Sequence, residues 1–135
     1  MSRLVSALAL FAAAGSFALQ AQTATLYADI PFEFRMGQSV MPAGKYAIEQ
    51  KAGVLKFQNT ENHKASIVLV QAAVRPLPGD AAVVFNRYGT EHFLSTVWSP
   101  YSGSGQMLPP SRHERELLSR LKGGVETASI PLRGK

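Results

Sequence analysis

The segment that most constrains the fold is residues 81–99, AAVVFNRYGTEHFLSTVWS. It contains two runs rich in β-branched and aromatic residues, which favour a pleated, half-buried strand. Gly89 and Thr90 separate the runs, and glycine permits the positive φ of a tight hairpin turn. The segment therefore predicts a β-hairpin with Gly89 and Thr90 at its tip.

Counting outward from these two turn residues fixes which side chains face one another across the hairpin. The expected pairs are Tyr88 with Glu91, Arg87 with His92, Phe85 with Leu94 and Val83 with Thr96. Trp98, the only tryptophan in the chain, falls on the returning strand and is expected to anchor the core.

The chain before the hairpin contains several shorter strand patterns. Residues 25–34 alternate in part between apolar and polar side chains, and Pro31 makes this an edge strand or a bulge because proline donates no hydrogen bond. Residues 45–50 and 54–59 predict two further strands. Residues 65–74 form the most continuously apolar run and predict a central strand that is covered on both faces.

Two stretches rich in proline, glycine and serine predict connections rather than strands. Residues 75–80 are expected to form a rigid surface loop, and residues 99–110 an irregular, turn-rich segment. Strands joined by short turns are typical of an antiparallel meander. We therefore predict an all-β fold, a small barrel or a sandwich of six to eight antiparallel strands, with one short C-terminal helix.

The helix is predicted at residues 112–122. Ser111 and Glu114 have the spacing of a capping box, in which the Ser111 hydroxyl accepts from the Glu114 amide and the Glu114 carboxylate reaches back. Gly123 and Gly124 predict a left-handed stop. The tail, residues 123–135, is expected to add a short strand at residues 128–132 or to be disordered.

An apolar stripe on this helix consists of Leu117, Leu118 and Leu121. A helix this short is not stable alone in water. We therefore expect the leucine stripe to dock the helix on the sheet.

The first residues have the pattern of a secretory signal peptide, at residues 1–21. A short positive end containing Arg3 leads into an apolar run over residues 4–19, with small residues before possible cleavage points after Ala18 or Ala21. The run is shorter than the roughly 20 residues that a membrane span needs. The pattern predicts an exported protein, periplasmic or secreted, with one β domain at residues 22–122 and no transmembrane segment after signal cleavage.

Composition narrows the class further. The chain has no cysteine, so an exported domain of this kind cannot rely on disulfides. Its formal net charge is +5, and from residue 111 onward six basic residues stand against three acidic ones. This mild excess lacks the dense basic run and interleaved aromatics of a nucleic-acid site, so no specific nucleic acid binding is expected.

Four motifs give the chain a resemblance to a known group. They are IPFEFRMG, MPAGKYAI, VVFNRYGTEHFLSTVW and LPPSRHEREL, which together span residues 30–118. In this order the chain resembles a group of small exported bacterial proteins with a proline-phenylalanine strand, a PAGxY turn, an RYG hairpin and an SxxEREL helix. That group has no established activity, so the resemblance implies compartment and architecture and no catalytic residue.

Polar side chains gather at the predicted hairpin tip. His92 beside Glu91 could suggest a general base, but successive strand residues face opposite ways, which favours a cross-strand polar cap. No catalytic residue and no cofactor are predicted. The candidate interaction surface consists of Arg87, Tyr88, Glu91, His92, Tyr101 and Arg112.

Two other sets of residues lack the pattern of a functional site. The three histidines, His63, His92 and His113, lack the spacing of a prearranged metal site. The segment Ser102-Gly103-Ser104-Gly105 lacks the sequence context of a phosphate loop or a nucleophile elbow, and a flexible loop is expected there.

These patterns predict an exported, non-catalytic interaction module of the cell envelope or periplasm, which binds through an exposed sheet edge or through residues 99–110. Its partner is an unknown envelope protein. The alternative is a carrier of a small apolar ligand in a lipocalin-like β pocket lined by the aromatic side chains. A filled core with an open edge favours the module, whereas an apolar pocket favours the carrier. An enzyme ranks third because no set of residues has catalytic spacing.

Overall fold

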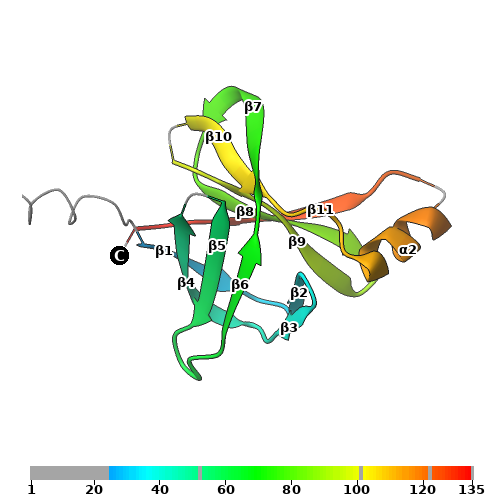
Figure 1. Cartoon of the computed structure of the whole chain (residues 1–135), viewed down its shortest axis with the longest axis horizontal. Coiled ribbons are helices and arrows are strands. Elements are labelled where there is room, and N and C mark those ends of the chain that lie inside the picture. Colours follow the sequence, from blue (N-terminus) through cyan, green and yellow to red (C-terminus); the bar gives the residue numbers. More distant parts are fainter. Residues whose placement is uncertain (1–24, 52, 101, 122, 135) are drawn as a thin grey trace, which may run out of the picture.

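The computed structural model describes residues 25–51, 53–100, 102–121 and 123–134. The predicted signal peptide, with its cleavage points after Ala18 and Ala21, lies outside this range, as does Tyr101. The described residues form an all-β fold with a single C-terminal helix, as predicted (Figure 1). The elements are β1 (Thr25–Ile30), β2 (Phe34–Met36), β3 (Ser39–Met41), β4 (Gly44–Lys51), β5 (Val54–Asn59), β6 (Ala65–Leu69), β7 (Gln71–Gly79), β8 (Ala82–Tyr88), β9 (Glu91–Trp98), β10 (Ser102–Met107), α2 (Arg112–Arg120) and β11 (Glu126–Pro131).

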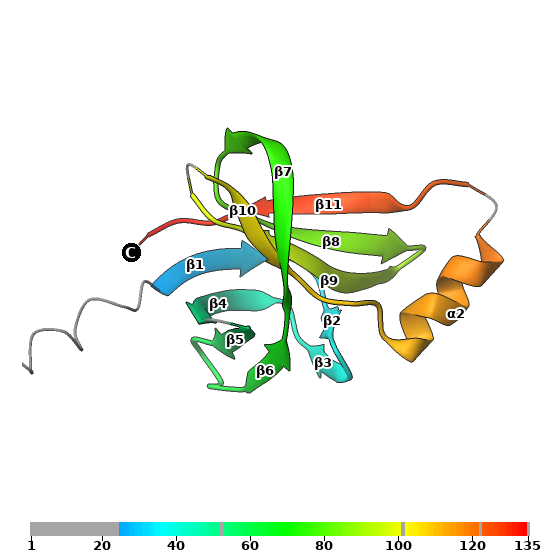
Figure 2. The same ribbon diagram turned by 45° about the horizontal axis from the view of Figure 1, so that its top comes forward.

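The strands form two sheets. One has four strands in the order β1-β4-β5-β6, and the larger one has the path β11-β8-β9-β10-β7. The short β2–β3 hairpin joins the larger sheet through a parallel contact between Arg35 of β2 and Phe93 of β9. β6 runs on into β7, so this segment carries the chain from one sheet to the other (Figure 2).

Two details of the predicted architecture are wrong. The described part of the chain has eleven strands rather than six to eight, because three-residue strands and strands rich in proline or glycine were not expected. The sheets also do not close into a barrel, since β1 and β6 remain separate edges of the four-stranded sheet.

Both sheets share one apolar core. The ring of Phe34 lies 5.2 Å from the rings of Tyr46 in the four-stranded sheet and Phe85 in the larger one, measured between centroids. Its centroid is 6.0 Å from that of Phe57. In a chain without cysteine, this burial of apolar surface is the main force that holds the two layers together.

The β8–β9 hairpin has its turn at the predicted glycine, and Gly89 adopts a φ of +63°. The pairs nearest the tip are confirmed: Tyr88 with Glu91, Arg87 with His92 and Phe85 with Leu94. Beyond Leu94 the register shifts, because Ser95 is an extra residue that makes a β-bulge. Val83 therefore pairs with Val97, and the expected pairing with Thr96 is wrong.

The bulge also explains why Trp98 is not a core anchor. It moves Val97 into the core, where its side chain is fully buried, and turns the next residue away. Trp98 is only half-buried. The guanidinium carbon of Arg75 lies 4.8 Å from the Trp98 ring, so the ring serves as a platform for a cation.

Two segments predicted to be loops are strands. Residues 75–79 belong to β7, and the glycine-rich segment that was expected to be flexible forms β10. Glycine is needed there because a Cβ atom on Gly105 would lie 2.6 Å from both the Trp98 ring and the Val97 carbonyl oxygen. The small residues therefore let β10 pack closely against β9.

The helix begins where the sequence predicted but ends earlier. Ser111 caps it, with its hydroxyl accepting from the Glu114 amide at 3.2 Å. The predicted stop at Gly123 and Gly124 is wrong, since α2 ends at Arg120 and Leu121 is extended, its amide donating to the Leu118 carbonyl.

The leucine stripe contributes less than expected to docking this helix. Leu117 and Leu118 are half-buried, and Leu121 is 40% exposed. The expectation that the whole stripe packs on the sheet is therefore wrong. After the helix, β11 pairs with residues 82–87 of β8, which is the strand alternative for the tail.

Gly105→Ala should lower the free energy of unfolding by about 1 to 3 kcal/mol, the usual cost of forcing extra volume into a packed site. Gly123→Ala is the matched control, because no atom lies within 4 Å of its added Cβ. Its effect should stay within about 0.5 kcal/mol. Urea unfolding of both variants measures the difference, and equal midpoints would contradict close β9–β10 packing.

Candidate functional site

The most unusual surface feature is the edge formed by β6 and the start of β7. Among the described residues, β6 pairs only with β5 and β7 only with β10. The prediction of a central, doubly covered strand at residues 65–74 is therefore wrong. The apolar run misled because only alternate residues, such as Ser66 and Val68, face the interior.

Large apolar side chains are exposed along this edge. Ile67 is 64% exposed and Leu69 is 79% exposed on β6, and β7 adds Val74 at 83% and Leu77 at 75%. No charged residue occurs between residues 65 and 74. An uncharged, apolar edge strand is a template on which another strand can pair.

The backbone of β6 shows which groups are free to pair. The Val70 amide donates to the Gly53 carbonyl, and the Asn59 amide donates to the Lys64 carbonyl. Because hydrogen-bonding direction alternates along an antiparallel strand, the even-numbered residues of β6 bond to β5. The odd-numbered residues, Ala65, Ile67 and Leu69, therefore direct their N–H and C=O groups away from the sheet.

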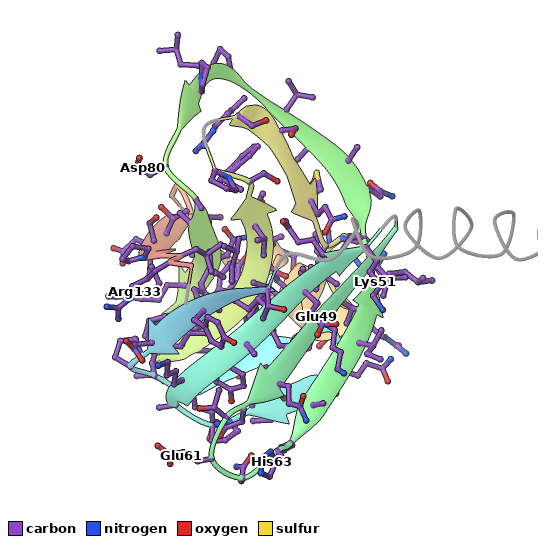
Figure 3. The ribbon with its side chains drawn as sticks, turned by 90° about the vertical axis from the view of Figure 1, so that its left-hand side faces the viewer. Glu49, Lys51, Glu61, His63, Asp80 and Arg133 are labelled. Atoms are coloured by element: carbon purple, nitrogen blue, oxygen red, sulfur yellow. The ribbon has the colours of Figure 1, made fainter. Side chains whose placement is uncertain are left out.

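The β2–β3 hairpin supports this strand from beneath. Lys64 Nζ donates to the Val40 carbonyl at 2.8 Å, and the Ser66 hydroxyl donates to the Ser39 hydroxyl at 3.3 Å. In Figure 3 β6 forms the margin of the four-stranded sheet, with the hairpin behind it. The contacts fix the inner face of β6 and leave its edge open.

Other sheet edges in the described ranges carry features that limit pairing. Tyr27 of β1 exchanges two backbone hydrogen bonds with Arg133, at 2.8 and 3.0 Å. Pro76 and Pro78 lie in β7, and β11 ends at Pro131. Proline and an added bridge are devices by which proteins stop strands from pairing at an edge. β6 carries neither device.

The hairpin tip brings four of the predicted surface residues together as two cross-strand pairs, although their side chains contact different partners. Arg87 forms an ion pair with Glu126 at 3.1 Å, whereas Arg112 lies on α2 beside Glu116 at 3.9 Å. Glu91 contacts His113 at 3.1 Å and Arg35 at 3.6 Å. Tyr88 is only 7% exposed, so including it in an exposed surface was wrong.

A buried carboxylate, which the sequence analysis assigned to a capping box, connects the helix to the hairpin. Glu114 is 4% exposed, and its carboxylate accepts from the Tyr88 hydroxyl at 2.8 Å and the Asn86 amide at 3.0 Å. The expectation that this carboxylate reaches back to Ser111 is therefore wrong. Burial and the Glu114 carboxylate raise the pKa of Tyr88, which keeps the hydroxyl protonated as a donor.

His92 occupies the opposite face of β9 from Glu91, as strand alternation predicted. Its ring stacks on Phe32 with centroids 3.7 Å apart. Burial lowers the pKa of His92, and the positive charge of Arg87 lowers it further. The predicted pairing of Arg87 with His92 across the hairpin is confirmed, and this arrangement favours a neutral, stacked ring.

The described ranges contain no group of three or more metal-ligating side chains close enough to share an ion. No helix in these ranges has the length and apolar character to cross a bilayer. Comparison with known proteins found no matching family model, and no similar curated protein or solved structure.

Tyr88→Phe should lower the free energy of unfolding by about 1.5 to 3 kcal/mol, because a buried carboxylate loses a hydrogen bond. Tyr27→Phe is the control, since the described contacts give its hydroxyl no hydrogen-bond partner. In the parent, the contribution of Tyr88 is complete below about pH 10 and lost above it, as the unfolded tyrosine ionises first. Urea unfolding between pH 7 and pH 11 should therefore show a smaller alkaline loss in Tyr88→Phe.

The imidazole of His92 should titrate below the usual histidine value of about 6.5. Arg87→Gln removes the positive charge across the hairpin and should raise the midpoint. Arg75→Gln, beside Trp98 at the other end of the hairpin, should leave it unchanged. NMR titration of the ring protons measures all three, and equal midpoints for Arg87→Gln and the parent would exclude the electrostatic effect.

Proposed function

We propose that this protein is an exported, non-catalytic interaction module of the cell envelope or periplasm, which binds a partner's strand along the open edge of β6. The observation that carries this proposal is an uncharged edge that exposes Ile67 and Leu69 and, within the described ranges, has no strand paired to it. In such strand addition, main-chain hydrogen bonds supply affinity and alternate side chains supply specificity.

The outer face of the sheet around this edge supports a binding role. Glu49 of β4 pairs with Lys56 of β5, which pairs in turn with Ile67. The two inner strands thus present charged side chains to water at the positions where β6 presents apolar ones. A change from charged to apolar along one solvent-facing row is typical of a contact surface.

The open edge is a better binding site than the segment at residues 99–110, which was the other predicted possibility. Half of that segment, residues 102–107, is β10, which already pairs with β9 on one side and β7 on the other. Its backbone groups are therefore used within the sheet.

The carrier alternative is less well supported by the shape of the interior. Aromatic rings from both sheets fill the core, with Phe34 between Tyr46 and Phe85. One of the larger hollows, of about 510 Å³, is open to solvent and is lined partly by the charged residues Asp29, Lys45 and Arg133. An apolar ligand needs a mostly apolar cavity.

Export is proposed from the sequence pattern at residues 1–21 and the motif resemblance. Fractionation of cells producing the protein with a C-terminal tag tests it. N-terminal sequencing of the periplasmic or secreted product should begin at residue 19 or 22. A membrane-bound product that retains Met1 would contradict the proposal.

Binding is tested by capture of partners from the envelope fraction with the tagged protein. Leu69→Lys should reduce the partner recovered by roughly tenfold or more, because a lost apolar anchor at an interface costs about 2 kcal/mol. Leu77→Lys is the matched control, since Leu77 is equally exposed but lies between the prolines of β7. Equal recovery by both variants, with unchanged circular dichroism, would exclude the β6 edge as the site.

A further inference from the structure

We infer that the strand accepted by β6 is β6 of a second copy of this chain, arranged antiparallel about a two-fold axis. The inference rests on the proposed function, because it names the partner of the same edge. It would join the two four-stranded sheets into one continuous sheet across the dimer.

The backbone restricts how two copies can pair. In an antiparallel pair, two residues exchange hydrogen bonds only when both direct their polar groups toward each other. On β6 these are the odd-numbered residues, as the Val70–Gly53 hydrogen bond establishes. A two-fold axis at Val68 meets this condition, because it places Ile67 of each copy opposite Leu69 of the other.

The side chains match in this register. Ile67 and Leu69, the two most exposed large apolar residues of β6, would cover each other twice on the outer face. On the inner face, Ser66 would lie opposite Val70, and the two Val68 side chains would meet at the axis. Large apolar side chains paired across strands stabilise a sheet, and like charges directly opposite destabilise it.

The edge lacks charges that would oppose pairing between two copies. Copies of a chain with a net charge of +5 repel each other, so a contact between them needs an uncharged surface. Residues 65–71 contain no charge, and Lys64 at their start is held by the Val40 carbonyl. In the proposed register Lys64 would face Ala72, so no like charges meet across the axis. A charged partner strand would find no opposite charge on the edge.

The two-fold arrangement also closes the assembly. At the far margin of each sheet, β1 is bridged to Arg133. In β7, which follows β6 in the chain, Pro76 and Pro78 lack the N–H groups that would extend the hydrogen bonds between the two copies. A two-fold contact uses the same edge of both copies. Because neither β1 nor β7 can extend the sheet to a third copy, the contact gives a dimer rather than a fibre.

The first experiment is a charge swap read by sedimentation equilibrium of the purified protein. Ile67→Lys alone and Leu69→Glu alone should each give monomers, because each puts a charge opposite an apolar residue at both ends of the interface. The double variant should regain the dimer, since each new lysine faces a new glutamate. Dimers that persist in both single variants would overturn the inference.

The second experiment uses the absence of native cysteine. Val68→Cys should form a disulfide-linked dimer under mild oxidation, because non-hydrogen-bonded residues at the axis lie about 4.5 Å apart between Cα atoms. Ala65→Cys is the control on the same strand. It pairs with Gln71, which leaves the two new thiols about 20 Å apart. Cross-linking through position 65 and not through position 68 would overturn the proposed pairing.

The two proposals fail separately. A parent protein that stays monomeric, yet captures a different protein through a contact that Leu69→Lys abolishes, would overturn the second-copy inference and leave the interaction module intact. A monomer whose capture is insensitive to Leu69→Lys would overturn both. A dimer that the charge swap abolishes and restores, and that cross-links at position 68, supports both.

Discussion

The contact on which the rest of the structure depends is the position of Phe34 between the two sheets. Its ring meets Tyr46 and Phe57 on one side and Phe85 on the other. Phe34 lies on a strand of only three residues, yet this strand brings the β2–β3 hairpin under β6. Because the chain has no disulfide to join its layers, the strands must arrange themselves around this aromatic cluster. The open edge of β6 is a consequence of that arrangement, since β7 leaves for the other sheet.

Local rules were sufficient for the elements whose neighbours are close in sequence. The hairpin near Gly89, the inward faces of β4 and β5, and the Ser111 cap all follow from turn chemistry, alternation and capping. These local rules failed where contacts between residues distant in the sequence determine the structure. The bulge at Ser95 is needed to bring Val97 into the core, and nothing within the hairpin sequence requires it. The sequences of β7 and β10 resemble loops because they contain proline and glycine. Proline is tolerated in an edge strand, and glycine is needed where two strands approach closely.

The candidate site was hidden for the same reason. An apolar run predicts burial, but the strand order decides whether a second face or edge is covered, and strand order is not a local property. Glu114 shows the same limit at a single residue. Its spacing from Ser111 correctly gave the amide contact, whereas its carboxylate found better donors in Tyr88 and Asn86, which lie far away in the sequence. The hairpin-tip residues were recognised as cross-strand partners, but their ion pairs with Arg35 and Glu126 depend on strands that are distant in the sequence.

The two faces of β6 have different requirements. The interior requires apolar or small side chains only at its even positions, where Val68 packs against the core and Ser66 contacts the hairpin. At Ile67 and Leu69 a solitary domain would gain solubility from lysine or glutamate, as Lys56 and Glu49 show on the neighbouring strands of the same face. Folding alone therefore does not account for two large apolar residues there. The proposed pairing with a second copy would account for them, because the same side chains would then bury their surface against a second β6.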